Sequence, residues 1–150
     1  MKNLLLRRML LLNSQNRGST AEKNLLTPSS LVITKEDTTK QLSQYVFFAT
    51  EDIISGTVYK LTGTASFEVT NTSDSGYLNI YFRGFPPNYL GKQAIRKIVA
   101  PSLTISTSEE INIDYTADKD YKGGSALMQV IFEKDGIGTI TFTNMKLVKI

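Results

Sequence analysis

The chain has 150 residues, of which 41% are hydrophobic and 21% are charged, a composition typical of one globular domain with room for a short appendage. It contains neither cysteine nor histidine, which excludes disulfides, thiolate chemistry, the common zinc sites and a histidine general base. We therefore predict a protein that is not an enzyme and that binds no metal or other cofactor. Ser-Lys or paired-carboxylate catalysis stays open in principle. The missing disulfides indicate folding in a reducing cytosol, although a bacterial extracellular module can also do without them.

Positive charge is concentrated at the N-terminus. The formal net charge is +3. Residues 1–27 carry five basic side chains and one acidic side chain, whereas the remaining 123 residues carry 12 basic and 13 acidic ones. The basic character therefore belongs to the N-terminal segment, and the rest of the chain lacks the basic run that nucleic-acid binding needs. We predict no nucleic-acid partner.

Residues 4–12 read LLLRRMLLL, an apolar segment with two adjacent arginines. Leucine, methionine and arginine favour helix, and β-branched residues are absent, so we predict a helix that must bury its apolar surface in a partner. The two arginines suit the edge of a protein interface better than a phosphate or lipid contact. The residues predicted to anchor the chain are Leu4, Leu5, Leu6, Arg7, Arg8, Met9, Leu10, Leu11 and Leu12.

This segment does not have the pattern of a targeting signal. The arginines interrupt the apolar run and no small-residue cleavage site follows it, so we predict neither a secretory signal nor a membrane span. Residues 13–24 are polar and contain Gly18, which indicates a flexible linker. The predicted division is an anchoring arm and linker over 1–24 and a folded body over 25–150.

The body is predicted to be all β. Apolar and polar residues alternate over 57–70, which indicates a half-buried antiparallel strand, and its length predicts a bulge or bend at Gly63. Residues 93–98 are predicted to form one helical turn. The other predicted strands are 31–34, 44–49, 77–82, 103–106, 110–115, 127–133 and 139–149. Such a succession of strands and polar turns is typical of a β-sandwich or barrel.

One predicted strand presents a candidate binding row. Its apolar side chains at 78, 80 and 82 are expected to face inward, which leaves Tyr77, Asn79 and Tyr81 outward, and Arg83 continues the row. Rings and amides on a sheet face suit a sugar, because a pyranose stacks on a ring while amides bond its hydroxyls. The alternative is that the tyrosines serve cross-strand packing. The absence of tryptophan argues against tight glycan binding.

Two other features are open to two interpretations each. The loop over 83–89 carries Phe85 and Tyr89 beside two prolines, so it either exposes these rings to a partner or tucks them under the sheet. Acidic residues near 51, 109 and 114–120 could supply calcium ligands or a carboxylate pair. Nothing in their spacing brings them together, and solvated loops are the favoured interpretation.

The body resembles the jelly-roll, galactose-binding-like carbohydrate-binding modules of bacterial xylanases and glucanases, and the similar domains of phage tail, fibre and decoration proteins. The resemblance covers about residues 25–150. It is carried by the opening Asn24-Leu25-Leu26, the strand over 57–63, the segment over 113–117 and the closing strand over 138–147. It implies an antiparallel jelly-roll β-sandwich of seven to nine strands, here preceded by a helical arm.

The resemblance also implies a function. Enzyme-linked members carry tryptophans on the concave face and an aspartate near the closing strand that helps to hold calcium, whereas this sequence has no tryptophan and has Asn144 there. A short N-terminal arm before a sandwich resembles the layout of a phage virion protein. We therefore expect a virion structural protein, assembled in the host cytoplasm, that contacts other virion proteins through residues 1–24 and forms a homo-oligomer. The alternative is a carbohydrate-binding module that uses Tyr77, Asn79, Tyr81 and Arg83.

Overall fold

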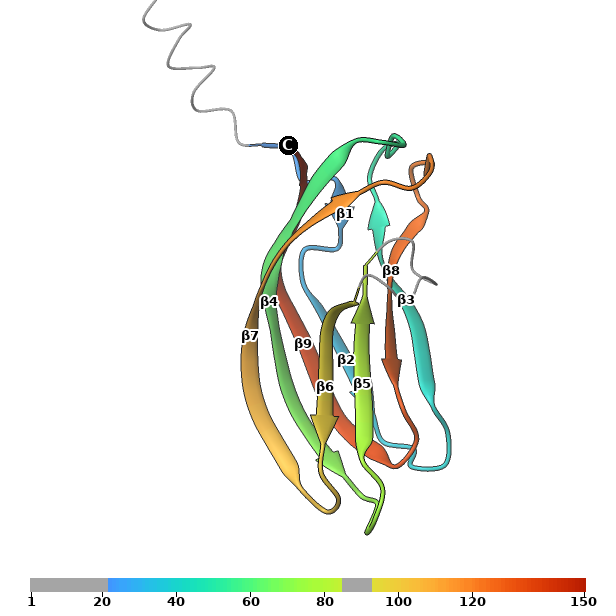
Figure 1. Cartoon of the computed structure of the whole chain (residues 1–150), viewed down its shortest axis with the longest axis vertical. Coiled ribbons are helices and arrows are strands. Elements are labelled where there is room, and N and C mark those ends of the chain that lie inside the picture. The colour runs from blue at the N-terminus through green and yellow to red at the C-terminus, as the bar shows by residue number, and fades with distance from the viewer. Residues whose placement is uncertain (1–21, 85–92) are drawn as a thin grey trace, which may run out of the picture.

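The computed structural model describes residues 22–84 and 93–150 (Figure 1). Within these ranges the chain is all β, with nine strands in two antiparallel sheets. The predicted helical arm over 4–12 lies outside the described residues. None of the described residues forms a helix long and apolar enough to cross a membrane.

The two sheets face each other as the layers of a sandwich (Figure 1). The five-stranded sheet has the order β1-β3-β8-β5-β6, and the four-stranded sheet has the order β2-β9-β4-β7. The strands are β1 (Leu26–Thr27), β2 (Leu31–Lys35), β3 (Leu42–Ala49), β4 (Val58–Asn71), β5 (Leu78–Arg83), β6 (Gln93–Val99), β7 (Thr104–Thr116), β8 (Ala126–Phe132) and β9 (Gly136–Lys149).

The connectivity is that of a jelly roll. From β2 to β9 every connection crosses from one sheet to the other, except the one between β5 and β6. These eight strands form two sheets of four, the arrangement of a double-sheet jelly roll, and β1 adds a short edge strand beside β3. The predicted jelly-roll sandwich of seven to nine strands is therefore confirmed for the described part of the chain.

Alternation along the strands builds the core between the sheets. In β4 the inward residues Tyr59, Leu61, Ala65, Phe67 and Val69 each expose at most 2% of their surface, as the sequence pattern predicted. At the centre, the rings of Phe47, Phe82 and Phe142 meet with centroid distances of 4.7 to 6.1 Å. These rings come from β3, β5 and β9, so both sheets contribute to one aromatic cluster.

The bulge predicted at Gly63 is present, and its extra residue lies on the partner strand. Thr62 pairs with Lys146 and Thr64 with Thr143, so the register between β4 and β9 shifts across Gly63. Asn144, inside the bulge, has a φ of 53°, and asparagine tolerates this left-handed conformation better than most residues. The bulge lets the two longest strands bend together without losing their pairing on either side.

Two predictions at the sheet edges were wrong. Residues 93–98 form strand β6 instead of a helical turn, and the two strands predicted within 103–115 are one continuous strand, β7. The cause lies in Lys97 and Glu109, which stand where apolar residues were expected. They form an ion pair between β6 and β7 at the open side of the sandwich, and this polar pair breaks the alternation of both strands.

The described ends of the chain meet at one end of the sandwich, called here the tether end (Figure 1). The amide of Leu25 donates to the carbonyl oxygen of Leu147 at 2.8 Å, and the amide of Ile150 donates to that of Val58 at 3.1 Å. The opposite end, called here the distal end, carries the turns over 36–41, 72–77, 100–103 and 133–135. Whatever precedes residue 22 therefore leaves the body far from the distal turns.

Candidate functional site

The predicted row lies on the outer face of the five-stranded sheet. Strand β5 places Asn79, Tyr81 and Arg83 outward, because the alternate residues Leu78, Ile80 and Phe82 are buried in the core with 2% exposure each. Strands β6 and β8 flank β5 on either side. The three outward side chains therefore lie on an interior strand of the sheet, where the neighbouring strands on both sides can add to the site.

Tyr81 is the centre of a cluster of positive charge. The guanidinium carbon of Arg83 lies 5.5 Å from the Tyr81 ring centroid, and that of Arg96 lies 5.4 Å from it. Arg96 comes from β6, where it pairs directly with Tyr81 across the two strands. At an exposed site each cation–π contact is worth about 0.5–1 kcal/mol, so the ring helps to position both guanidinium groups.

Asn79 holds one of these arginines. Its side-chain oxygen accepts a hydrogen bond from Arg96 Nη2 at 3.0 Å. Its backbone amide and its side-chain amide donate to Glu133 Oε2, at 3.2 and 3.4 Å. The orientation of the Asn79 side-chain amide is therefore fixed, because its oxygen faces a donor and its nitrogen faces an acceptor. Asn79 thus lies between the carboxylate of Glu133 and the guanidinium of Arg96.

The hydrogen-bonding capacity of the arginines is largely unused within the described part of the chain. A guanidinium has five N–H donors. None of the ion pairs between described residues includes Arg83 or Arg96. Arg83 Nε is buried and has no hydrogen-bond partner there. Two neighbouring cations repel each other, and no ion pair with a described carboxylate offsets that repulsion.

The fourth predicted residue, Tyr77, lies at the distal end of the row. It precedes β5, and 66% of its surface is exposed. Ile98 on β6, which pairs with Asn79, is 53% exposed. The structure thus brings Asn79, Tyr81 and Arg83 together, while Tyr77 marks the edge of the same face.

Sequence reasoning missed Arg96 and Glu133. Arg96 was hidden because residues 93–98 were interpreted as a helical turn, although Ile95 and Val99 alternate with it as a strand requires. Glu133 follows β8 directly, and no sequence pattern places it beside Asn79. Its contact depends on the pairing of β5 with β8, which is a long-range relationship.

The described residues that β8 and β3 add to this face are neutral. On β8, Gln129 donates from its side chain to the Ser43 hydroxyl at 2.8 Å. Tyr45, which pairs with Gln129, is 47% exposed. These residues continue the outer sheet face from β5 to β3 and carry amide, hydroxyl and phenol groups. The face therefore offers polar groups for a ligand that spans several strands.

The outer face of the four-stranded sheet is occupied by its own hydrogen bonds. Ser66 and Ser108 hydroxyls lie 2.8 Å apart, those of Thr70 and Thr104 lie 2.7 Å apart, and the Ser106 hydroxyl donates to Glu68 at 2.5 Å. Because cross-strand partners satisfy these groups, this face offers less to a ligand than the five-stranded sheet.

The remaining sequence candidates have structural roles or lie outside the described residues. Of the loop over 83–89, only Arg83 and Gly84 are described. The acidic residues near the tether end shape loops: Asp118 accepts from the Tyr121 hydroxyl at 2.6 Å, and Asp120 from the Ser55 amide at 2.7 Å. The backbone amide of Gly123 and the side chain of Lys122 hold the pKa of the Asp52 carboxyl below its usual value.

No group of three or more acidic side chains within the described ranges is arranged to hold a metal ion. The acidic residues that the sequence offered as calcium ligands or as a carboxylate pair are thus engaged separately, with Asp52, Asp118 and Asp120 in loops at the tether end and Glu109, Glu110 and Asp114 along β7. The contacts of Asp52 and Asp120 join the segment over 50–57 to the segment over 117–125 at the tether end.

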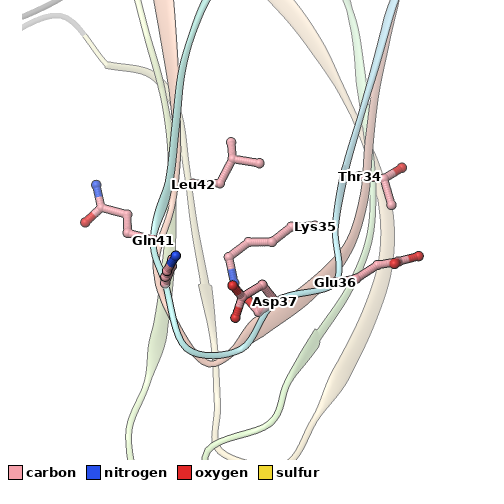
Figure 2. Close-up of a pocket in the computed structure, with 7 residues that line it drawn as sticks. Thr34, Lys35, Glu36, Asp37, Gln41 and Leu42 are labelled. Carbon is pink, nitrogen blue, oxygen red and sulfur yellow. The ribbon is translucent and has the colours of Figure 1, made fainter.

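A pocket of about 300 Å³ lies at the distal end, between the end of β2 and the start of β3 (Figure 2). The Lys35 side chain extends across it toward Asp37. Its ammonium donates to the carbonyl oxygens of Asp37 and Gly136, the latter at 2.6 Å, and lies 5.4 Å from the Phe132 ring centroid. Burial lowers the pKa of Lys35, while the nearby carboxylates of Asp37 and Asp135 oppose the shift. The lysine ties two distal turns together.

No protein-family model matches the sequence, and no curated protein is similar to it. Solved structures with a similar fold include a CBM4 protein, with 16% identity and a TM-score of 0.41 over 86% of this chain and 91% of that chain. VP2 from a subviral particle of infectious bursal disease virus has 16% identity and a TM-score of 0.41, over 87% of this chain and 32% of that chain. The enzymatically active domain of tailspike protein 4 from bacteriophage CBA120 has 14% identity and a TM-score of 0.40, over 87% of this chain and 18% of that chain.

The chain therefore spans nearly all of the first of these proteins and a third or less of the other two. Carbohydrate-binding modules and viral capsid or tail proteins are both among the solved structures found.

Proposed function

We propose that the chain is a non-enzymatic structural protein of a virion, such as a capsid decoration, head-fibre or tail component of a phage. Residues 1–24 bind other virion proteins, and the sandwich projects outward as part of a homo-oligomer. The observation that supports this most is that hydrogen bonds fix the chain at the point where it enters the sandwich, at the tether end. Asn24 is held by three hydrogen bonds to Leu26, Met145 and Leu147, so a partner bound to the preceding residues would hold the sandwich by one end.

The hydrogen bonds made by the aspartates at the tether end agree with a role that is not catalytic. Asp52, Asp118 and Asp120 accept hydrogen bonds that shape the loops at the tether end. Paired-carboxylate chemistry would need two carboxyl groups across an open cleft, and these carboxylates are instead engaged by neighbouring backbone and side chains.

The test compares the full chain with a shortened chain that starts at Asn24, which keeps every hydrogen bond of that residue. We expect the full chain to form an oligomer and the shortened chain to be a folded monomer, as measured by light scattering after gel filtration. A full chain with Ser14→Ala in the predicted linker serves as the control and should assemble normally. A shortened chain that keeps the mass of the full oligomer would contradict the anchoring role.

A second candidate function is carbohydrate recognition by the outer face of the five-stranded sheet. The grouping of Asn79, Tyr81 and Arg83 with Arg96 on that face supports it. We expect weak binding in a broad glycan screen and loss of that binding in Tyr81→Ala. The absence of any binding across neutral and acidic glycans would exclude this candidate.

A further inference from the structure

We propose that the ligand of the outer sheet face is an acidic polysaccharide, whose carboxylate or sulfate groups are bound by Arg83, on the same strand as Tyr81, and by Arg96, on the neighbouring strand β6. This inference rests on the second candidate function, carbohydrate recognition, and names the class of sugar. The first ground is charge. The two guanidinium groups border one aromatic ring, and no described carboxylate forms an ion pair with either.

The second ground is preorganisation. Asn79 fixes Arg96 through its side-chain oxygen at 3.0 Å, and the Tyr81 ring contacts both guanidinium groups. Planar guanidinium groups recognise carboxylate and sulfate oxygens through paired hydrogen bonds. An anion placed between the two arginines would neutralise charges that otherwise repel each other, and the arginines need little reordering to receive it.

The third ground concerns Tyr81 itself. Its ring is already in contact with two cations, so it is less available as an open stacking surface for a neutral sugar. We assign it as a positioning residue that holds the two arginines. The ring alone is needed for this, so Tyr81→Phe should bind as the native chain does, whereas Tyr81→Ala should not.

A negative charge also borders the row. Glu133 accepts both hydrogen bonds from Asn79 on the side away from Arg96. It makes no ion pair with either arginine among the described residues. Its charge repels an acidic ligand, and Glu133→Gln keeps an acceptor for Asn79. We therefore expect this variant to bind an acidic polysaccharide about two- to threefold more tightly.

Polysaccharide is favoured over nucleic acid because the cationic cluster is small and the body is not basic. From residue 28 onward, the chain carries 12 basic and 13 acidic side chains. Nucleic-acid binding relies on an extended basic surface. The exposed neutral side chains of Ser43 and Tyr45 on the same face suit sugar hydroxyls.

The experiment measures binding of the full chain by calorimetry to polygalacturonate and to its methyl ester, which has the same backbone without the charge. Dextran sulfate and dextran form a second pair that distinguishes sulfate from carboxylate. We expect binding to at least one charged polymer and much weaker binding to its neutral partner. Removing both guanidinium groups, in Arg83→Gln/Arg96→Gln, should weaken binding by about 10- to 100-fold.

The matched control removes two positive charges from the other sheet, in Lys60→Gln/Lys146→Gln, and should change affinity by less than about twofold. If circular dichroism shows that Arg83→Gln/Arg96→Gln does not fold, Arg83→Lys/Arg96→Lys replaces it. This variant keeps both charges and should still lose affinity, because lysine lacks the planar guanidinium group. An equal loss in the control, or tighter binding of a single-stranded oligonucleotide, would overturn the proposal.

The outcomes separate this inference from the function on which it rests. Equal binding of charged and neutral polymers, or binding of neutral ones only, would overturn the acidic ligand and leave carbohydrate recognition standing. Binding to none of the four polymers overturns the acidic ligand. If a neutral glycan screen is empty as well, carbohydrate recognition also fails.

Discussion

Asn24 and Leu147, far apart in the sequence, are joined by a hydrogen bond from the Leu147 amide to the Asn24 side-chain oxygen at 2.9 Å. The same oxygen accepts from the Leu26 amide at 3.1 Å, and the Asn24 side-chain amide donates to the Met145 carbonyl at 2.9 Å. One side chain thus joins the start of the body to the end of β9.

Replacing this residue tests how much the junction stabilises the sandwich. Asn24→Ala removes all three side-chain hydrogen bonds and leaves partly buried backbone groups unpaired, so the free energy of unfolding should fall by about 2–3 kcal/mol. Urea denaturation measures the change. Asn112→Ala, on the exposed edge strand β7, should alter stability by less than about 0.5 kcal/mol. Equal effects of the two changes would contradict the assigned role of Asn24.

Gly63, which lies opposite the bulge in β9, should not tolerate a side chain. Gly63 has a φ of 154°, and a Cβ there would collide with the Met145 side chain. We expect Gly63→Ala to lower the free energy of unfolding by about 2–4 kcal/mol. Gly124→Ala is the matched control: its φ is 89° but it has open space around it, so it should cost only about 1–2 kcal/mol. A smaller effect at Gly63 than at Gly124 would show that the strand relieves the collision.

Lys35 should make the stability depend on alkaline pH. Burial lowers the pKa of its ammonium below the ordinary value, so between the two pKa values the unfolded chain binds more protons than the folded one. Stability from this group is therefore gained as the pH rises through that window. In urea denaturation between about pH 7 and pH 10, the native chain should gain stability relative to Lys35→Met. A parallel pH dependence of both proteins would contradict this.

The ion pair between Lys97 and Glu109 closes the open side of the sandwich and is more shielded than other pairs. Its side chains expose 20% and 38% of their surface, against 39% and 56% for Lys60 and Asp114. A double-mutant cycle with Lys97→Met and Glu109→Gln should give a coupling of about 0.5–1 kcal/mol that decreases with salt. The same cycle on Lys60 and Asp114 should give a smaller value, and the reverse order would contradict the comparison.

Local patterns predicted most of this fold. Alternation in β4 and β5 identified the buried residues, including Phe67 and Phe82, and the length of β4 together with Gly63 predicted the bulge. Prediction failed where a polar residue occupies an inward position, as Lys97 does, because its partner Glu109 comes from another strand. The candidate site was also predicted only in part. Tyr81 and Arg83 were predicted because they share one strand, whereas Arg96 and Glu133 were missed because they join that strand only through strand pairing.

The position of β9 has a consequence for the order in which the protein is made. Of the nine described strands this one leaves the ribosome last, yet it lies between β2 and β4 and pairs with both. The four-stranded sheet therefore cannot be completed until β9 has emerged, and the edges of β2 and β4 that pair with β9 stay unpaired until then. Long-range pairing of this kind makes folding slow compared with helical proteins, so a growing chain exposes β2 and β4 to other growing chains. Copies of this protein made on one messenger RNA can exchange strands before each closes its own sandwich.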